Sequence, residues 1–324
     1  MLRHAITLTC YLLVAAACAC CLEPSGASAQ ACCVGGGGQL GVVGRERRAA
    51  LTARLGYQRA MGSYANDGSY HGLRGASIDD LTLELGGGVR LFDHRLELSG
   101  TLPTRLQHRS YRGSQGSARV GLGDASLGVG LMLIRGSVDG VRRREPGTWI
   151  PFLDLNLGVL VPSGRAPENS HDQNGADVMG GGHFTLQGGL RLSQFVSLRQ
   201  ILTLSVLFER GLARDVHSLA GASHRYRPGA AVSLRASWLY ARDMRWSGGL
   251  FVTTRLGRPA HQDRERVAGS ASRSFSFGAL LSWVFILPIW EATLSMSVDP
   301  FFSGPGRNLP QVGPRLSLLM KRSF

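Results

Sequence analysis

The sequence predicts an all-β protein, a closed antiparallel transmembrane β-barrel of about 12 strands preceded by a cleaved signal peptide. Beyond residue 48, apolar and polar residues alternate in successive segments of strand length, and short and long connections alternate between these segments. Aromatic residues gather toward the segment ends. A period of two indicates strands, because successive side chains of a strand point to opposite faces.

The composition disfavours an ordinary soluble enzyme. The chain has 324 residues, of which 44 are glycine and 18% are charged. Soluble domains average about 25% charged residues and about 7% glycine. The length suits one or two globular domains or a single large barrel.

The segment at 1–29 predicts an export signal. A short basic start at Met1–His4 precedes an uncharged stretch, and Ala27–Ser28–Ala29 has the small-x-small pattern of a signal peptidase site. An uncleaved anchor helix is the alternative, and cleavage before a cysteine with lipid attachment is a minor one. We therefore expect three parts: a signal peptide at 1–29, a periplasmic N-terminal segment at 30–48 and the barrel at 49–324.

The mature chain would keep two of the six cysteines, Cys32 and Cys33. Adjacent cysteines cannot join distant strands, because a disulfide needs suitably separated and oriented Cβ atoms. We expect either a local disulfide or a pair of free thiols. Strand pairing and packing must then hold the exported body together.

Twelve segments carry the alternation. In one of them Leu81, Leu83 and Leu85 point one way, while Thr82 and Glu84 point the other. The predicted strands are 49–61, 79–92, 94–107, 118–135, 148–162, 182–193, 197–211, 228–241, 244–257, 272–286, 289–301 and 312–324.

The connections alternate in length. They are tight at 92–94, 194–196, 242–243 and 287–288, moderate at 136–147, and long at 108–117, 163–181, 212–227, 258–271 and 302–311. Outer-membrane barrels have short periplasmic turns and long outside loops, so we expect both chain ends in the periplasm. The 136–147 connection, which carries Arg142–Arg144, is longer than a periplasmic turn should be.

A soluble β-sandwich would also alternate, but its solvent-facing positions would carry many charges. Here the polar face is mostly Ser, Thr, Gly and Gln. In hydrocarbon an unpaired backbone group is costly, so a membrane-spanning sheet must close on itself. The aromatic residues near the strand ends are typical of interfacial girdles: Tyr57, Trp149, Trp238, Tyr240, Trp246, Trp283 and Trp290.

The uncharged run Ser274–Trp290 is a competing signal for a transmembrane helix, since its length is at the lower limit for a helix that spans a bilayer. Phe275 and Phe277 alternate with serines, and Pro288 lies where a turn is needed. We therefore expect two strands here.

The C-terminal strand resembles the signature that the outer-membrane assembly machinery recognises. Phe324, Met320, Leu318 and Leu316 share one face. Arg322 replaces the expected apolar residue, and so close to the interface its guanidinium could reach the head groups.

Charged residues on the polar face are the candidates for solute selectivity in the lumen. The basic ones are Arg54, Arg90, Arg191, Arg235, Arg245 and Arg255, and the acidic ones are Glu84, Glu97, Glu209 and Asp299. Unpaired arginines would favour anionic solutes, whereas arginines paired with the acids would only fill the interior. We favour the paired interpretation, because isolated charges in a confined lumen are costly.

The formal net charge of +14 would ordinarily suggest nucleic-acid binding, but export argues against it. The expected outside loops hold a set of arginines that could pair with lipopolysaccharide phosphates: Arg109, Arg112, Arg225, Arg227, Arg258, Arg264 and Arg266.

No motif predicts a metal, a cofactor or enzymatic activity. Residues 171–177 mimic part of a calcium loop but lack the third carboxylate and the terminal glutamate. The histidines lie singly, which disfavours zinc. An outer-membrane hydrolase would need a Ser/His/Asn-type site, and no spacing singles one out.

Three short motifs resemble the transporter barrels associated with the meta-pathway of phenol degradation. They are Gly123–Asp124 running to Leu127–Gly128, the run Pro151–Val159 closing in Val161–Pro162–Ser163–Gly164, and Gly180–Gly182 before the next alternating strand. The resemblance covers about residues 80–324, and Pro-Ser-Gly departs from the more usual Pro-Thr-Gly. It implies an outer-membrane barrel that passes small, often aromatic molecules, and it implies no catalytic residues.

Together these features predict an outer-membrane protein of a Gram-negative bacterium that lets small aromatic or anionic solutes pass. The alternatives are a non-conducting structural barrel that holds lipopolysaccharide and, in second place, an outer-membrane hydrolase. The expected partners are outer-membrane lipid and lipopolysaccharide, the barrel-assembly machinery and a small-molecule solute, without nucleic acid.

Overall fold

A computed structural model describes residues 47–64, 69–73, 75–111, 113, 115–136, 150–217, 223–243, 245–267, 270–286, 290–299 and 309–324. Several sequence predictions lie outside these residues: the signal peptide at 1–29, Cys32, Cys33, Arg112, Arg142–Arg144, Trp149 and Pro288.

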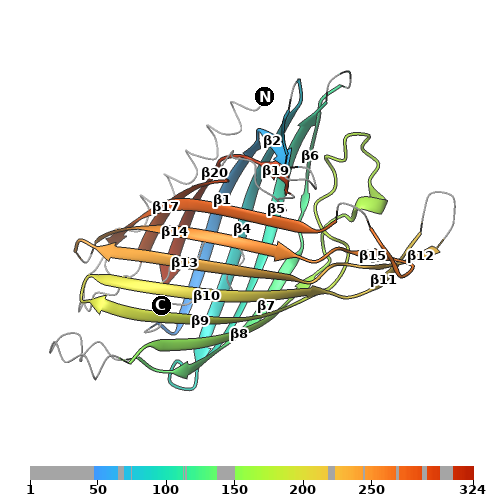
Figure 1. Cartoon of the computed structure of the whole chain (residues 1–324). Helices are drawn as coiled ribbons and strands as arrows, with labels where there is room; N and C mark the ends of the chain where they lie inside the picture. Colours follow the sequence, from blue (N-terminus) through green and yellow to red (C-terminus); the bar gives the residue numbers. More distant parts are fainter. Residues whose placement is uncertain are drawn as a thin grey trace.

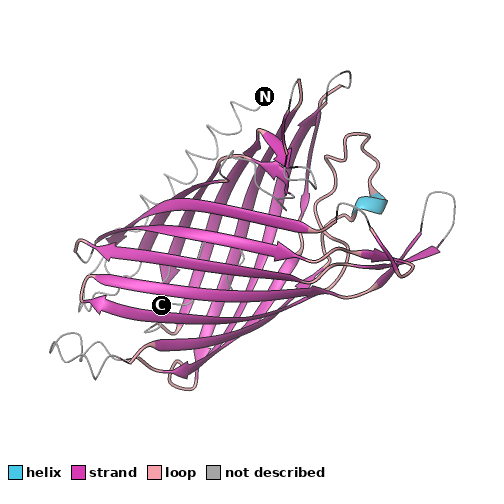
Figure 2. Cartoon of the chain, in the orientation of Figure 1, coloured by secondary structure: helices cyan, strands magenta, loops and turns pink. Residues whose placement is uncertain are grey.

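The described chain is a closed barrel of antiparallel strands (Figures 1 and 2). Going round the wall, the strands are β1 (Ala49–Ala60), β4 (Ser77–Leu91), β5 (Leu96–Ser110), β7 (Ala125–Ile134), β8 (Phe152–Val161), β9 (Thr185–Ser197), β10 (Gln200–Gly211), β13 (Ala231–Ala241), β14 (Trp246–Gly257), β17 (Ser272–Ile286), β18 (Trp290–Val298) and β20 (Arg315–Ser323). β20 pairs with β1, so the sheet closes on itself. The twelve predicted strands are all confirmed.

One predicted strand, 118–135, is interrupted at Gly123–Asp124. Its first part, β6 (Ser117–Leu122), and its second part, β7, both pair with β5. Pro103 of β5 lies opposite the break, and its carbonyl accepts the Gly123 N–H at 2.8 Å. Because proline has no N–H to donate, the ladder cannot continue regularly at this point.

The short connections share one end of the barrel, called the turn end below. The first turn places Phe92, Asp93 and His94 at positive φ angles of 50°, 52° and 67°. The second lies at Leu198–Arg199, so the predicted turn at 194–196 is wrong by a few residues, because β9 continues to Ser197. The last residue, Phe324, lies at this end too, and its carbonyl accepts the Arg48 N–H at 3.1 Å.

The long connections share the opposite, loop end, and they contain short strands that alternation did not predict. One small sheet consists of β2 (Gly62–Tyr64), β3 (Tyr70–Gly72) and β19 (Leu309–Val312). A second consists of β11 (Arg214–His217), β12 (Ser223–Arg227), β15 (His261–Gln262) and β16 (Glu265–Arg266), and projects beyond the barrel wall in Figure 1. These strands are too short to show a period of two, and partners such as β12 and β15 are far apart in sequence.

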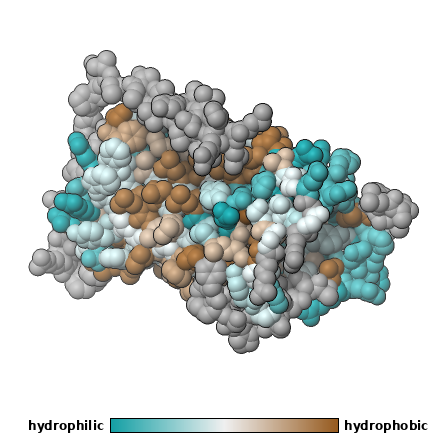
Figure 3. Space-filling view, turned by 90° about the horizontal axis from the view of Figure 1, so that it is seen from above, coloured by the Kyte–Doolittle hydropathy of each residue, from teal (hydrophilic) through white to brown (hydrophobic). Residues whose placement is uncertain are grey.

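Burial in the barrel is the reverse of burial in a soluble protein. The outward side chains of Leu85 and Leu157 are 54% and 52% exposed, whereas Arg90 and Asp154 are only 8% and 3% exposed. In Figure 3 hydrophobic side chains form patches along the middle of the visible face, and hydrophilic ones gather at its ends. Such an apolar band is what a surrounding lipid phase requires.

Residues 272–286 form strand β17, so the competing interpretation of Ser274–Trp290 as a transmembrane helix is wrong. Within the described ranges, no helix has the length and apolar character needed to span a bilayer. A short 3-10 turn, η2 (Pro167–Asn169), lies in the β8–β9 connection.

Candidate functional site: the inner wall of the barrel

The strand register places several predicted lumen charges, together with Asp154, on one face of the sheet. Arg54 is opposite Glu84, Arg90 opposite Glu97, and Asp154 opposite Arg191. Residues paired across antiparallel strands point to the same side, and their sequence neighbours, such as Leu85 and Leu192, are exposed on the outer side. The inner wall is therefore polar and the outer wall apolar.

Two ion pairs line the lumen near the turn end. They are called the turn-end ring below. Arg90 Nη2 lies 3.0 Å from Glu97 Oε2, and Arg191 Nη2 lies 3.0 Å from Asp154 Oδ2. All four of these residues are buried. The side chains of the ring are therefore packed against their neighbours and narrow the lumen at this level.

The middle of the lumen is lined by Arg54, Glu84 and Arg235. Arg54 Nη1 is 3.5 Å from Glu84 Oε1. The Arg235 guanidinium lies 4.2 Å from the centroid of the Phe251 ring, a cation–π contact. Arg235 is paired in register with Ser205 and Thr253, which are small and polar.

Toward the loop end, two further acids are bound by arginines. Arg255 Nη1 lies 2.6 Å from Glu209 Oε2, and Gln187 Nε2 donates to Glu209 Oε1 at 3.0 Å. Arg315 Nη2 lies 2.9 Å from Asp299 Oδ2.

The four nominated acids, Glu84, Glu97, Glu209 and Asp299, each lie beside an arginine. Sequence reasoning did not nominate Asp154 and Arg315, although the alternation alone puts both on the polar face. Arg245 differs from the other nominated arginines. It lies in the β13–β14 turn, where its N–H donates to Asp243 Oδ1 at 2.7 Å.

The β8–β9 connection, residues 162–184, folds against the inner wall at the loop end. A Cβ atom on the inward-facing Gly121 would meet Met179 Cγ at 3.0 Å, so a larger residue here would push the Met179 side chain away from the wall. Arg105, also inward, donates to the Met179 carbonyl at 3.3 Å. Asp124, at the β6–β7 break, accepts the N–H groups of Gly164 at 3.1 Å and Gly181 at 2.7 Å. The connection narrows the mouth of the lumen.

Buried and bonded carboxylates hold this connection together. Burial raises the pKa of Asp177, but hydrogen bonds from Ser170, the His171 N–H and Arg165 outweigh it and hold the pKa well below its usual range. The hydroxyl of Ser117 on β6 lowers the pKa of Asp172, with help from neighbouring backbone N–H groups. Hydrogen-bond donors of the protein therefore bind Asp172 and Asp177, the carboxylates of the calcium-like stretch 171–177.

A third carboxylate ties the connection to the projecting loop sheet. Glu168 binds the guanidinium of Arg214, which also donates to the Gly181 carbonyl at 3.3 Å. This pairing lowers the pKa of Glu168.

Aromatic side chains form a girdle on the outer wall near the turn end. Trp246 and Trp283 stack with centroids 5.4 Å apart, and Trp283 contacts Phe285 at 5.5 Å. Arg322 places its guanidinium 4.7 Å from the Phe324 ring and 5.5 Å from the Trp290 ring. The arginine that departs from the assembly signature is thus part of the girdle. Of the signature residues, Leu316 and Phe324 are 46% and 51% exposed, and Leu318 and Met320 are half-buried.

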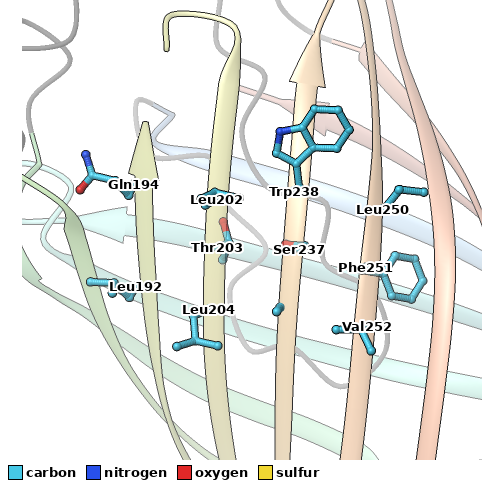
Figure 4. Close-up of a pocket in the computed structure, with 11 residues that line it drawn as sticks. Leu192, Gln194, Leu202, Thr203, Leu204, Ser237, Trp238, Leu250, Phe251 and Val252 are labelled. Carbon is cyan, nitrogen blue, oxygen red and sulfur yellow. The ribbon is translucent and has the colours of Figure 1, made fainter. Parts of the chain in front are cut away.

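A depression of about 590 Å³ also lies on the outer wall (Figure 4). Leu192, Leu204, Trp238 and Val252 line it, together with the small Ala236. Its lining is almost wholly apolar, so a lipid chain rather than a polar solute suits it.

The described residues contain no group of three or more His, Cys, Asp or Glu side chains that could hold a metal ion. A serine–histidine hydrogen bond joins Ser69 Oγ to His71 Nε2 at 2.9 Å, and these residues are only two positions apart. No carboxylate of the described chain binds the other ring nitrogen, so the geometry of a hydrolase triad is not formed there.

Comparison with solved structures identifies the fold as that of outer-membrane barrels. The chain is similar to the crystal structure of the COG4313 outer membrane channel from Pseudomonas putida F1, with a TM-score of 0.67 and 14% identity over 90% of this chain and 100% of that one. The NanC porin has a TM-score of 0.42 and 10% identity, covering 85% of this chain and 98% of the porin. The β domain of the Bordetella autotransporter BrkA has a TM-score of 0.48 and 11% identity, covering 86% and 100%.

No family model matches the chain, and no curated protein matches it either. The resemblance to the meta-pathway transporter barrels therefore stays a prediction. At 14% identity the channel from Pseudomonas putida shows a shared fold only.

Proposed function

We propose that the barrel lets small solutes pass passively across the outer membrane of a Gram-negative bacterium. The observation that carries the proposal is the reversed burial of its wall, with apolar side chains exposed outside and polar, charged ones enclosed inside. A polar inner wall in a membrane barrel is expected either to line a water-filled path for solutes or to pack against other polar side chains that fill the interior.

The proposed path enters at the loop end and becomes narrower along its length. It passes the docked connection 162–184, then the level of Arg54, Glu84 and Arg235, and finally the turn-end ring. At mid-height two arginines, Arg54 and Arg235, line the lumen together with one acid, Glu84. We infer a preference for small anionic solutes, and the aromatic ring of Phe251 beside Arg235 would also suit an aromatic acid.

The decisive experiment is single-channel recording of the purified, refolded protein in planar bilayers of phosphatidylcholine. Discrete conductance steps, with a reversal potential that indicates anion preference, support the proposal. Silence over long recordings of correctly folded protein, as judged by heat-modifiable gel migration, overturns it.

A non-conducting envelope barrel is the second candidate, and the turn-end ring favours it. The buried Arg90–Glu97 and Arg191–Asp154 pairs could fill the lumen completely at that level. This candidate predicts silence in bilayers and outer-membrane defects when the protein is deleted. A hydrolase, the third candidate, would cleave an ester substrate and lose that activity when one serine is changed.

The proposed location in the outer membrane implies several partners. An export signal at 1–29 would send the chain to the periplasm, and the strand ending in Phe324 would be recognised by the barrel-assembly machinery. Lipopolysaccharide would surround the loop end, where exposed arginines are available to its phosphates.

A further inference from the structure

A basic cleft of about 680 Å³ lies on the projecting loop sheet. It is lined by Arg225 and Arg227 of β12 and by Arg264 of the β15–β16 turn, and His261 and Asp263 complete its charged and polar lining. We call this feature the arginine cleft. Its volume is in the range of sites that hold small molecules.

The arginine cleft lies on an extension of the inner wall. The register that pairs β10 with β13 continues without a shift into β11 and β12, and that of β13 with β14 continues into β12 and β15. Because residues two apart on a strand share a face, the face that carries Glu209, Arg235 and Arg255 in the barrel continues into the loop sheet. Its members there are Ala213, Arg225, Arg227 and His261.

Residues without long side chains connect this cleft to the lumen. The inward positions of β10, β13 and β14 next to the loop sheet are Gly211, Ala231 and Gly257. Arg255 follows at the level of Ser233, about 20 Å from Arg227 at about 3.4 Å per residue of extended chain. A solute that moves from the arginine cleft along this face therefore reaches Arg255 first and the middle of the lumen next.

The acid of the cleft is already bonded to its neighbours. Asp263 Oδ1 accepts the Arg225 backbone N–H at 2.7 Å, and Oδ2 lies 2.6 Å from His224 Nδ1. The side chains of Arg225, Arg227 and Arg264 are exposed and form no ion pair with another described residue. The three guanidinium groups thus give the arginine cleft a net positive charge and are accessible to a solute.

The turn that carries Arg264 is fixed against β12. Asp263 and Arg264 have positive φ angles of 49° and 77°, which non-glycine residues seldom adopt. The bonds from His224 and from the Arg225 N–H to Asp263 hold this turn in place. A third arginine therefore lines the same cleft from a different connection.

The spacing of the arginines favours a solute with two acidic groups. Arg225 and Arg227 are two positions apart on one face of β12, so their Cα atoms are separated by about 7 Å. A guanidinium binds one carboxylate through two parallel hydrogen bonds. A solute with two carboxylates can therefore bind both arginines at once, whereas a solute with one carboxylate can bind only one of them in this way.

We propose that the arginine cleft is the entry site of the lumen and binds small solutes that carry two carboxylate groups. Its positive charge raises the local concentration of such anions at the mouth of the barrel. The inference rests on the proposed passage of solutes, and it adds the class of solute and the residues that bind it first.

The test measures binding to the full-length protein in a non-ionic detergent at low salt, by titration in saturation-transfer difference NMR. The probes are terephthalate and benzoate, which have the same ring and differ by one carboxylate. The wild type should bind terephthalate at least about 10-fold more tightly than benzoate, because the second carboxylate adds charge-assisted hydrogen bonds. The Arg225→Gln/Arg227→Gln variant should bind terephthalate at least about 10-fold more weakly than the wild type.

The matched control is Arg210→Gln/Arg273→Gln. It removes two exposed arginines from the outward face of β10 and β17 at the loop end, and it should bind both probes like the wild type. Heat-modifiable gel migration checks the fold of each variant. If the cleft double variant fails to fold, Arg264→Gln replaces it, and unchanged terephthalate binding by Arg264→Gln would overturn the site.

Three other results would contradict the inference. Equal terephthalate binding by the wild type and the cleft variant, or equal losses in the cleft and control variants, would overturn the entry site. Equal binding of terephthalate and benzoate by the wild type would overturn the preference for two carboxylates. Binding in detergent does not require conduction, so a silent channel with intact, cleft-dependent binding would count only against the proposed transport function.

Discussion

Arg191 and Asp154 are bonded across the inner faces of β9 and β8, with Arg191 Nη2 and Nε at 3.0 and 3.1 Å from Asp154 Oδ2. The residues on either side of Arg191, Leu190 and Leu192, are 47% and 40% exposed on the outer wall, whereas Arg191 is 9% exposed. One strand therefore carries a buried ion pair on one face and a lipid-facing surface on the other. Removing either charge should have very different consequences from changing an exposed pair.

Asp154→Asn should destabilise the barrel by about 3 kcal/mol, because Arg191 keeps its buried charge and loses the opposite one. Urea unfolding of the protein in lipid vesicles measures this change. The double variant Asp154→Asn/Arg191→Gln should recover part of the loss. Arg59→Gln is the control, since Arg59 is 60% exposed and 3.8 Å from Asp79, and it should cost less than about 1 kcal/mol. Equal effects of Asp154→Asn and Arg59→Gln would contradict the enclosed position of the turn-end ring.

Arg235→Gln should reduce the preference for anions, because it removes a positive charge from the middle of the lumen. The reversal potential in a salt gradient across a planar bilayer should shift toward that of a non-selective pore. Arg245→Gln removes the same charge from the β13–β14 turn and serves as the matched control. A reversal potential unchanged by Arg235→Gln would place the selectivity elsewhere.

How much of this site was visible in the sequence depends on the range of the interactions involved. Alternation along the chain predicted the twelve strands and put Arg54, Arg90 and Glu97 on the inner face, because a period of two is a local property. Ion pairs such as Asp154 with Arg191 could not be predicted in this way. The two residues are 37 positions apart, and their pairing depends on the register of β8 against β9.

The contacts at the loop end could not be predicted from the alternation of apolar and polar residues. The docking of residues 162–184 depends on Asp124 and Gly121, which the sequence shows only as part of a glycine-rich stretch. The projecting loop sheet joins residues of two different connections through the pairing of β12 with β15. Neither contact leaves a periodic signal, since both involve single residues at long sequence separation.

Asp124→Ala should release the connection 162–184 from the wall, because its carboxylate accepts the N–H groups of both Gly164 and Gly181. Trypsin cleavage after the exposed Arg165 should become about 10-fold faster, and channel conductance should increase. Asp243→Ala removes a similar backbone acceptor from the β13–β14 turn and should leave both quantities unchanged. Cleavage rates that stay at the wild-type value in Asp124→Ala would show that other contacts hold the connection.

Acid should release the same connection. The pKa values of Glu168, Asp172 and Asp177 are lowered in the fold, so their stabilisation is complete above their ordinary values of 4.5, 3.8 and 3.8 and is lost as the pH falls through the lowered values. Conductance should therefore be constant between about pH 7 and 5 and rise below about pH 4. Asp177→Asn imitates the protonated carboxyl and should show a higher conductance already at pH 7. A rise centred near pH 6 would point to histidine rather than to these carboxylates.

The outward leucines provide a test of the membrane position that is independent of conduction. Leu204 lies in the middle of β10 and is 49% exposed, whereas Leu212 lies just beyond the loop-end edge of the strand and is 42% exposed. If hydrocarbon surrounds the middle of the wall, Leu204→Arg should cost about 2–4 kcal/mol and Leu212→Arg no more than about 1 kcal/mol, because the penalty for arginine falls toward the interface. Urea unfolding from vesicles measures both variants. In a water-soluble barrel the two positions, being similarly exposed, would tolerate arginine equally well, and that result would remove the basis for the proposed membrane location.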